Sequence, residues 1–352
     1  MMKENEENRI NTFSIGFDKK KFDETEKSRV VAKLINSKHH EFIINEKSLY
    51  SDLDEILNNF DEPFADSSAL ATYYISKKTK NYVTVALTGD GGDEVFGGYN
   101  RYFMTSLSEN YRTYVPYICH KHLIKPLFNS FKVQNDNRGR MFKYKKFING
   151  VGQNEKDDIS NIISLGFLNN EKKDLLIDYT NTTFSKLIDH HYNSSSTLSQ
   201  LAKSRFIDIN VSLEGDMLVK VDRASMLASL ECRSPLLDPR LVNFSFKLPD
   251  NFLIKGSQTK YILKETFKNM LPIGLFNLPK SGFGVPVGDW LRNELKFELL
   301  DLTKDELLIK QNIFNINYIN QIISEHLAKK NDHTFKLWTI FCFQKWWINN
   351  FK

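Results

Sequence analysis

The chain of 352 residues is long enough for one large domain or two, and 41% hydrophobic with 26% charged residues is the composition of a globular protein. A net charge of +5, spread over many lysines, is a weak hint of nucleic-acid binding, and a solvated surface is the favoured interpretation, so nucleic acid is not an expected partner. Three cysteines without a CxxC pair argue against a disulfide framework or a zinc site and favour a cytoplasmic location. Because the chain has no apolar run as long as a membrane span and no signal-peptide pattern, no membrane partner is expected.

Strand and helix patterns alternate over the first ninety residues. Strands are predicted over residues 11–17, 40–44 and 82–87, the last as a buried strand. A helix is predicted after a capping-box-like start at Asp23, and two more over residues 49–57 and 69–79, with a loop over residues 61–68. This alternation predicts an α/β fold with a parallel sheet.

Helical periodicity dominates after Tyr102, and no further strand is predicted. The polar, lysine-rich stretch 138–193 is expected to form helices with variable loops. The aromatic-rich end, residues 333–351, is predicted to be a helix packed in the core rather than a base-stacking platform. We therefore expect an α/β nucleotide-binding portion over residues 1–104 and a mainly helical portion over residues 105–352.

A glycine-rich acidic segment, TGDGGDEVFGGY at residues 88–99, follows the third predicted strand. Its glycines allow a ligand to approach the backbone closely, and Asp90, Asp93 and Glu94 are oxygen ligands that suit Mg²⁺ bridging to phosphates. Nucleotides bind at the carboxyl ends of strands in open α/β sheets. The segment predicts an ATP-using enzyme, rather than a turn with solvent-facing acids or a calcium loop, whose spacing does not match.

Three further segments carry charged residues in unusual settings. They are DEPFADSS at 61–68, VKVDRASM at 219–226 with ECRSPLLD at 231–238, and PKSGFGVP at 279–286. The first could equally be a helix start. Charges among apolar residues in a helix must pair or face a ligand, and a lysine such as Lys280 on a Gly/Pro loop can reach a phosphate. Each segment alone is a weak signal.

Together these segments resemble the synthetase domain of glutamine-hydrolysing asparagine synthetases. The matching segments, in family order, are TFSIGF, DEPFADSSAL, VALTGDGGDEVFGGYNRY, LVKVDRASMLASLECRSPLLDPRLV, PKSGFGVPVGDWLR and the terminal H-x₄-W block. β-Lactam synthetases share the fold and several motifs. The resemblance implies a PP-loop ATPase fold that uses ATP and Mg²⁺ to turn the aspartate carboxylate into an acyl-adenylate, from which ammonia displaces AMP.

The resemblance also implies roles for individual residues. It implies nucleotide contacts for Ile15, Thr88, Gly89 and Asp93, and magnesium contacts for Asp93 and Glu94. It implies catalytic roles for Asp90, near the activated carboxylate, and for Lys280, on the phosphates. It implies a substrate pocket lined or braced by Tyr99, Lys220, Asp222 and Arg223.

Two departures from the family pattern stand near the start of the chain. Position 2 is Met2, where the family's glutaminase domain would have its cysteine nucleophile, and the family's Ser-Gly-Gly-x-Asp-Ser pyrophosphate loop is absent from the sequence. We expect a family domain that is incomplete at its N-terminus and lacks the strand between strands 12–17 and 82–87. Those strands would lie about 10 Å apart with unpaired edges, twice the usual spacing.

Alternatives for the function remain open from the sequence. The chain alone is expected to bind ATP poorly and to be inactive or unstable, so a separate glutaminase or a loop-bearing polypeptide is a candidate partner. The acceptor could instead be another carboxylate, such as a sugar acid or a β-lactam precursor. The chain could also be an inactive remnant or a complementing subunit.

Overall fold

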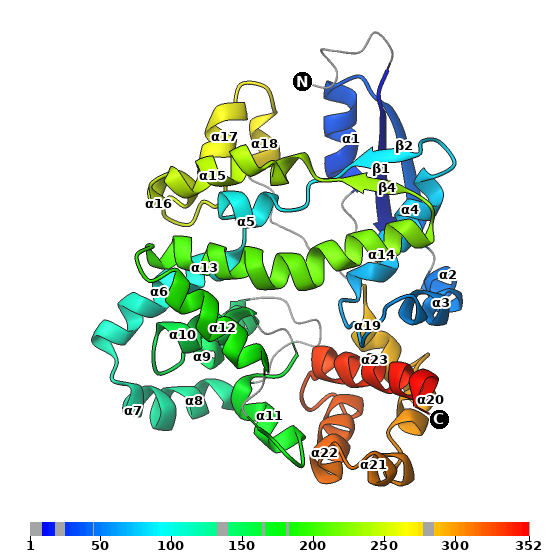
Figure 1. Ribbon diagram of the computed structural model, residues 1–352, viewed down its shortest axis with the longest axis vertical. Helices are drawn as coiled ribbons and strands as arrows, with labels where there is room; N and C mark the ends of the chain where they lie inside the picture. Colours follow the sequence, from blue (N-terminus) through cyan, green and yellow to red (C-terminus); the bar gives the residue numbers. More distant parts are fainter. Residues whose placement is uncertain are drawn as a thin grey trace.

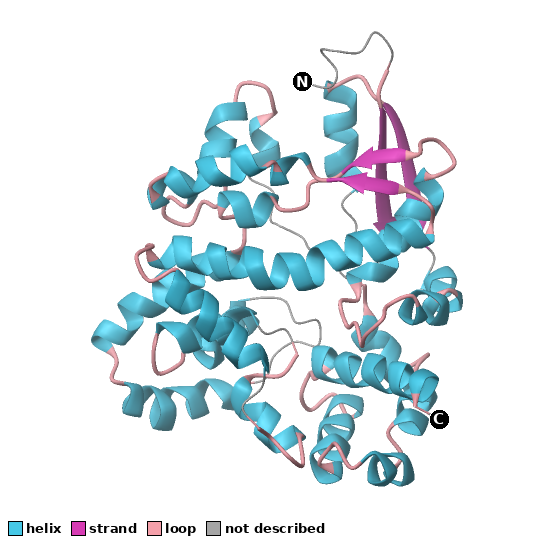
Figure 2. Cartoon of the chain, viewed as in Figure 1, coloured by secondary structure: helices cyan, strands magenta, loops and turns pink. Residues whose placement is uncertain are grey.

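The computed structural model describes residues 9–17, 25–44, 46–131, 140–163, 166–180, 183–276 and 285–351. Helices make up most of this part, with two small sheets in its upper half (Figures 1 and 2). Among the described residues, no helix combines the length and apolar character needed to cross a membrane.

The first sheet pairs β1 (Asn11–Phe17) with β2 (Lys38–Ile44) in parallel, and Asn11 lies opposite Lys38. Both predicted strands are confirmed. Helix α1 (Thr25–Leu34) joins them, and α1 and α4 (Ser68–Thr79) both pack on the sheet. The predicted capping residue Asp23 lies outside the described residues.

The second sheet pairs β3 (Val85–Leu87) in parallel with β4 (Glu231–Arg233), which the sequence did not predict. The prediction of a buried strand over residues 82–87 is wrong, because the side chains of Val85 and Leu87 are 39% and 55% exposed. Among the described strands, β3 pairs with β4 alone and β1 with β2 alone. Parallel strands are normally covered on both faces, so β3 lacks the usual cover.

The predicted helix over residues 49–57 is two short helices, α2 (Glu46–Ser51) and α3 (Leu53–Asn58). Leu49, Leu53 and Ile56 of the predicted apolar face are nevertheless buried, and Leu57 is partly buried. The next described helices are α5 (Gly92–Phe96), α6 (Asn100–Tyr114), α7 (Tyr117–Cys119), the π-helix η3 (His120–Ile124), α8 (Lys125–Ser130), α9 (Arg140–Gly150), α10 (Glu155–Ile163), α11 (Asn169–Leu175) and α12 (Thr183–Ser194).

A long helical run crosses the middle of the molecule (Figure 1). It consists of α13 (Gln200–Asp208), the π-helical η4 (Ile209–Leu218) and α14 (Val219–Leu227). The later described helices are η5 (Pro235–Leu237), α15 (Pro239–Lys247), α16 (Asp250–Leu253), α17 (Tyr261–Phe267), α18 (Ile273–Phe276), α19 (Val287–Arg292), α20 (Lys296–Leu302), α21 (Asp305–Gln311), α22 (Ile316–Leu327) and α23 (Thr334–Asn350). Because π-helical turns often occur at functional sites, η4 is a candidate region for one.

The aromatic C-terminal helix α23 packs in the largest hydrophobic core, as predicted. Leu337, Trp338 and Phe341 are all at most 1% exposed. The division of the chain at residue 104 stays a prediction, since β4 of the second portion pairs with β3 of the first.

A buried histidine joins α19, α22 and the start of α23. The ring of His326 accepts hydrogen bonds at Nδ1 from the His333 N–H (3.1 Å) and from Arg292 (3.2 Å), and Nε2 lies 3.3 Å from the Gly288 carbonyl. This network assigns the neutral ring with its proton on Nε2. Burial, followed by the Arg292 charge, lowers the pKa of His326 to about 4.

We expect the buried His326 to make the folded protein less stable in acid. Above pH 6.5 the ring is neutral in both states; between about 6.5 and 4 the unfolded chain binds the proton and the folded chain does not. Stability should therefore fall as the pH drops through this window, by up to about 3 kcal/mol. Urea unfolding of the wild type and of His326→Asn at pH 7 and pH 4.5 measures the effect. Equal pH dependence of the two proteins would contradict it.

Candidate nucleotide and substrate site

The glycine-rich segment lies at the carboxyl ends of β3 and β4. Thr88 joins the two strands there: its N–H donates to the Arg233 carbonyl (2.8 Å), and its hydroxyl lies 3.1 Å from that of Ser234. Helix α5 follows within four residues. The segment therefore occupies the edge where a parallel sheet presents its ligand-binding loops.

Several positions of this segment favour glycine, and Gly91 and Gly98 show two different reasons. Gly91 has φ +79°, and a Cβ there would stand 2.1 Å from a methyl carbon of Leu237. At Gly98, a Cβ would stand 1.9 Å from a carboxylate oxygen of Asp93. Gly89 differs, because a Cβ there would meet no atom within 4 Å. Gly89 thus leaves open space beside Thr88, where a ligand could approach the backbone.

Asp93 carries the exposed negative charge of α5, and a lysine distant in sequence faces it. Lys260 Nζ lies 3.1 Å from Asp93 Oδ1, and both side chains remain about a quarter to a third exposed, at 32% and 25%. Lys260 precedes α17 and has φ +52°. The sequence analysis missed Lys260, although it follows the turn-forming run Gly-Ser-Gln-Thr.

Glu94 points away from Asp93 into the interior, where it is 1% exposed. The Tyr99 hydroxyl donates to Glu94 Oε1 at 2.7 Å, and burial raises the pKa of Glu94. Beside this pair, Arg101 stacks on the Tyr99 ring and forms an ion pair with Asp208 at 2.9 Å. This placement favours structural roles for Glu94 and Tyr99; magnesium binding by Glu94 stays a prediction that the geometry does not support.

Arg205 of α13 anchors α5 through hydrogen bonds to its backbone. Its guanidinium donates to the carbonyls of Glu94 (2.9 Å) and Val95 (2.6 Å) and to the Ser245 hydroxyl (2.7 Å). Arg205 is 1% exposed, and burial lowers its pKa to about 10. The sequence analysis did not identify this residue, which fixes the helix that presents Asp93.

Lys220 lies in a buried charge cluster at the junction of η4 and α14. Its Nζ stands 3.4 Å from Asp66 Oδ2 of the DEPFADSS segment. Burial, and then the Asp66 charge, raise the pKa of Asp216 to about 7, against the opposing effects of Lys220 and Arg101. Perturbed acids next to a lysine are typical of polar ligand sites. Asp66 and Asp216 were not predicted individually.

The other predicted pocket residues of α14 lie apart from this cluster. Asp222 is exposed. Arg223 forms an ion pair with Asp61, and its carbonyl accepts a hydrogen bond from the Asn59 side chain at 2.9 Å. Arg223 therefore braces α14 against the loop after α3.

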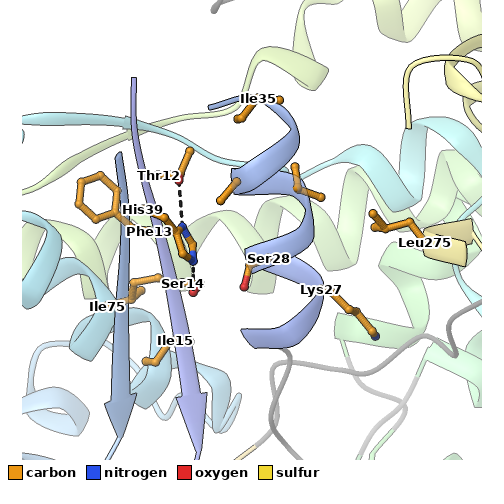
Figure 3. Close-up of a pocket in the computed structure, with 12 residues that line it drawn as sticks. Thr12, Phe13, Ser14, Ile15, Lys27, Ser28, Ile35, His39, Ile75 and Leu275 are labelled. Atoms are coloured by element: carbon orange, nitrogen blue, oxygen red, sulfur yellow. Dashed lines mark hydrogen bonds between the residues drawn. The ribbon is translucent and has the colours of Figure 1, made fainter. Parts of the chain in front are cut away.

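Ile15 is 5% exposed and helps to line a cavity of about 440 Å³ between β1 and α1. In Figure 3, Thr12 and Ser14 both face the ring of His39, at 2.9 Å and 3.1 Å. The consecutive residues 12–15 all line this cavity. Because successive strand residues point to opposite faces, the cavity runs along the edge of β1.

Asp90 and Lys280 are the two predicted catalytic residues. Asp90 is half-buried near β4, where its charge contributes, after burial, to raising the pKa of Cys232. Lys280 lies outside the described residues, so its proximity to Asp93 stays a prediction.

The loop was also predicted to bind a metal ion. Within the described ranges, no group of three or more histidine, cysteine or acidic residues could hold one. Mg²⁺ commonly binds through one or two carboxylates and takes its other ligands from phosphates and water. Asp93, partly exposed beside Lys260, fits an ion that arrives with a nucleotide.

Comparison with known proteins extends the likeness to the whole chain. The family model described as asparagine synthase matches residues 1–348. The chain belongs to the asparagine synthase family. It is 30% identical over 339 residues to asparagine synthetase [glutamine-hydrolyzing] 1 of Bacillus subtilis, covering 96% of this chain and 52% of that protein. It is 28% identical over 344 residues to a putative asparagine synthetase [glutamine-hydrolyzing] of Mycobacterium bovis, covering 96% and 50%.

A third relative matches only a short stretch of this chain. This stretch of 91 residues is 43% identical to a putative asparagine synthetase [glutamine-hydrolyzing] 2 of Methanocaldococcus jannaschii, covering 26% of this chain and 18% of that protein. The chain thus spans about half the length of the relatives that it matches along its own length.

Proposed function

We propose that this chain carries the synthetase site of an ATP-dependent ligase that converts aspartate to asparagine through a β-aspartyl-AMP intermediate. Ammonia would come from glutamine through a separate glutaminase. The observation that carries the proposal is the Asp93–Lys260 pair on a glycine-rich loop at the strand ends, in a chain of the asparagine synthase family. The relatives' names supply the substrate.

The reaction places a carboxylate against an anionic phosphate, so charge compensation is the main task. A β-carboxylate oxygen of aspartate attacks the α-phosphorus of ATP, and the bond to pyrophosphate breaks. Ammonia then attacks the acyl carbon, AMP leaves and a proton is lost. Mg²⁺, bound with ATP at Asp93, would neutralise phosphate charge. Lys260, and Lys280 if it approaches, would stabilise the departing pyrophosphate electrostatically.

The remaining residues would position the substrates. Thr88 and Gly89 leave the backbone accessible for the nucleotide, and Ile15 would face the adenine. Asp90 lies at the same strand ends, where the acyl-adenylate would meet ammonia. Lys220, in its cluster with Asp66 and Asp216, could bind the charged groups of an amino acid, because the cluster offers both signs of charge.

We further propose that the isolated chain is impaired and that a polypeptide carrying a Ser-Gly-Gly-x-Asp-Ser loop completes it. The sequence lacks that run. Among the described strands, β1 and β3 belong to separate sheets and each pairs with one strand alone, which supports a missing strand at an edge of one of them. The open edge of a parallel strand can pair with the main chain of an added strand.

The test measures aspartate-dependent exchange of labelled pyrophosphate into ATP, with and without a family segment that carries the loop. We expect little exchange by the chain alone, exchange after addition of the segment, and asparagine when ammonia is supplied. Asp93→Asn should abolish the exchange. Asp301→Asn is the matched control, because Asp301 also pairs with a lysine at 3.1 Å but is 73% exposed on α20.

Each other outcome has a definite meaning. Full exchange without the segment would contradict the need for a partner but support the ligase. Exchange with a sugar acid or a β-lactam precursor, and not with aspartate, would favour a related amidotransferase. No exchange with any acid in the presence of the segment would refute the ligase and leave a remnant or a complementing subunit.

A further inference from the structure

A second cavity lies in the helical part of the chain, apart from the glycine-rich loop. It has a volume of about 560 Å³ and is lined by residues of η3, α8, the end of α9 and the start of α10. In Figure 1, α7 and α8 lie at the lower left, whereas α5 lies above the run α13–η4–α14. The volume is in the range of small-molecule sites, and no step of the proposed ligase reaction uses this cavity.

Two lysines one helical turn apart give the cavity a positive wall. Lys121 and Lys125 both line it, and neither forms an ion pair within the described part of the chain. Burial lowers the pKa of Lys125, Glu171 opposes this and Lys121 adds to it. Glu171 is already paired with Lys336 at 2.7 Å. Lys125 is half-buried and Lys121 is exposed, so the Lys125 charge gains most from a compensating anion.

A buried histidine packs behind the same wall. His120 is 1% exposed, and its Nδ1 lies 3.0 Å from the Tyr111 hydroxyl. Burial and then the Lys125 charge lower the pKa of His120, and a backbone hydrogen bond with Val151 opposes this shift. The ring therefore fixes this part of the wall, next to Lys121.

The opposite walls are polar and fixed. Asn129 of α8 and Asn149 of α9 exchange hydrogen bonds through their amide groups, at 3.2 Å and 3.0 Å, which ties the two helices together. The cavity's acid, Asp157, accepts a hydrogen bond from the backbone N–H of Gln153 at 3.3 Å. The Asp157 carboxylate is therefore partly engaged by the backbone. Two lysines against one aspartate leave the lining of the cavity net positive.

We propose that this cavity binds a small anion that carries carboxylate or phosphate groups, held by Lys121 and Lys125. Such a ligand would compensate the charges of both lysines. Carboxylate and phosphate present the same anionic oxygens to lysine, so the two sources must be compared directly.

The experiment is calorimetric titration of the full chain with citrate in one arm and inorganic phosphate in the other. We expect at least one to bind, with a dissociation constant on the order of 1 mM, more weakly in high salt. Lys121→Gln/Lys125→Gln should weaken binding at least tenfold. Lys304→Gln, which removes one lysine charge from the exposed surface near α20, should bind as the wild type does.

Three results would overturn this inference. They are no binding of either anion to the wild type, equal binding by the double variant, or loss of binding in Lys260→Gln alone, which would place the anion at the glycine-rich loop. An unchanged thermal midpoint of the double variant controls for folding. Because the readout is binding rather than pyrophosphate exchange, its failure leaves the proposed ligase untouched, and the reverse also holds.

Discussion

Replacing Arg205 with methionine is expected to lower the free energy of unfolding by about 3 to 5 kcal/mol. The guanidinium is 1% exposed and supplies the hydrogen bonds to the Glu94 and Val95 carbonyls at the end of α5. Methionine can fill much of the volume but cannot donate, so both carbonyls would be left buried and unpaired, at a cost of about 1 to 3 kcal/mol each. Urea denaturation followed by circular dichroism measures the change.

Two control variants separate lost hydrogen bonds from lost charge. Lysine keeps the charge but lacks the planar guanidinium that reaches both carbonyls. Arg205→Lys should therefore be less stable than the wild type and more stable than Arg205→Met. Arg240→Met removes an arginine whose side chain is 92% exposed and should change stability by no more than about 0.5 kcal/mol. If Arg205→Met unfolds at the wild-type urea concentration, α5 does not depend on this contact.

Gly91→Ala is expected to destabilise the fold by about 2 to 4 kcal/mol. The backbone there has φ +79°, which an L-residue adopts at a cost, and the new methyl group would stand 2.1 Å from Leu237. The turn would have to unwind or move away from η5. Thr88, Asp90 and Asp93, which the turn connects, would lose their common arrangement.

Gly89→Ala is the matched control, two residues earlier in the same loop. A Cβ at Gly89 meets nothing within 4 Å, so its thermal midpoint should equal that of the wild type. Its nucleotide binding could still fall, because Gly89 is proposed to lie against ATP. Equal midpoints for Gly91→Ala and Gly89→Ala would mean that the turn is not strained as described.

The elements that could be predicted from the sequence are those whose pattern is local. β1 and α1 carry apolar residues at the period of a strand and of a helix, and α23 is recognisable by its density of aromatic residues. β4 could not be predicted, since three residues, two of them charged, form a strand only because Val85–Leu87 offers a partner edge. The break between α2 and α3 also escaped, because the apolar face continues across it.

The sequence predicts the site residues that lie in a segment of unusual composition. It does not predict the residues that the fold brings to the site from distant parts of the chain. Asp93 and Glu94 are neighbours in sequence, yet one helical step of about 100° turns the first outward and the second into the core. Lys260 stands 3.1 Å from Asp93 although 167 positions separate them in the chain. No local pattern reports such a contact. Arg205 escaped for the same reason, since its partners are backbone carbonyls.

The two separate sheets have a practical consequence for the free chain. A strand with an open edge and exposed apolar side chains, as at Val85 and Leu87, is a template for pairing with another molecule. We therefore expect the free chain to form aggregates whose abundance rises steeply with concentration. On the proposal that a loop-bearing polypeptide pairs with such an edge, co-expression with that polypeptide should raise the soluble yield even before any turnover is assayed.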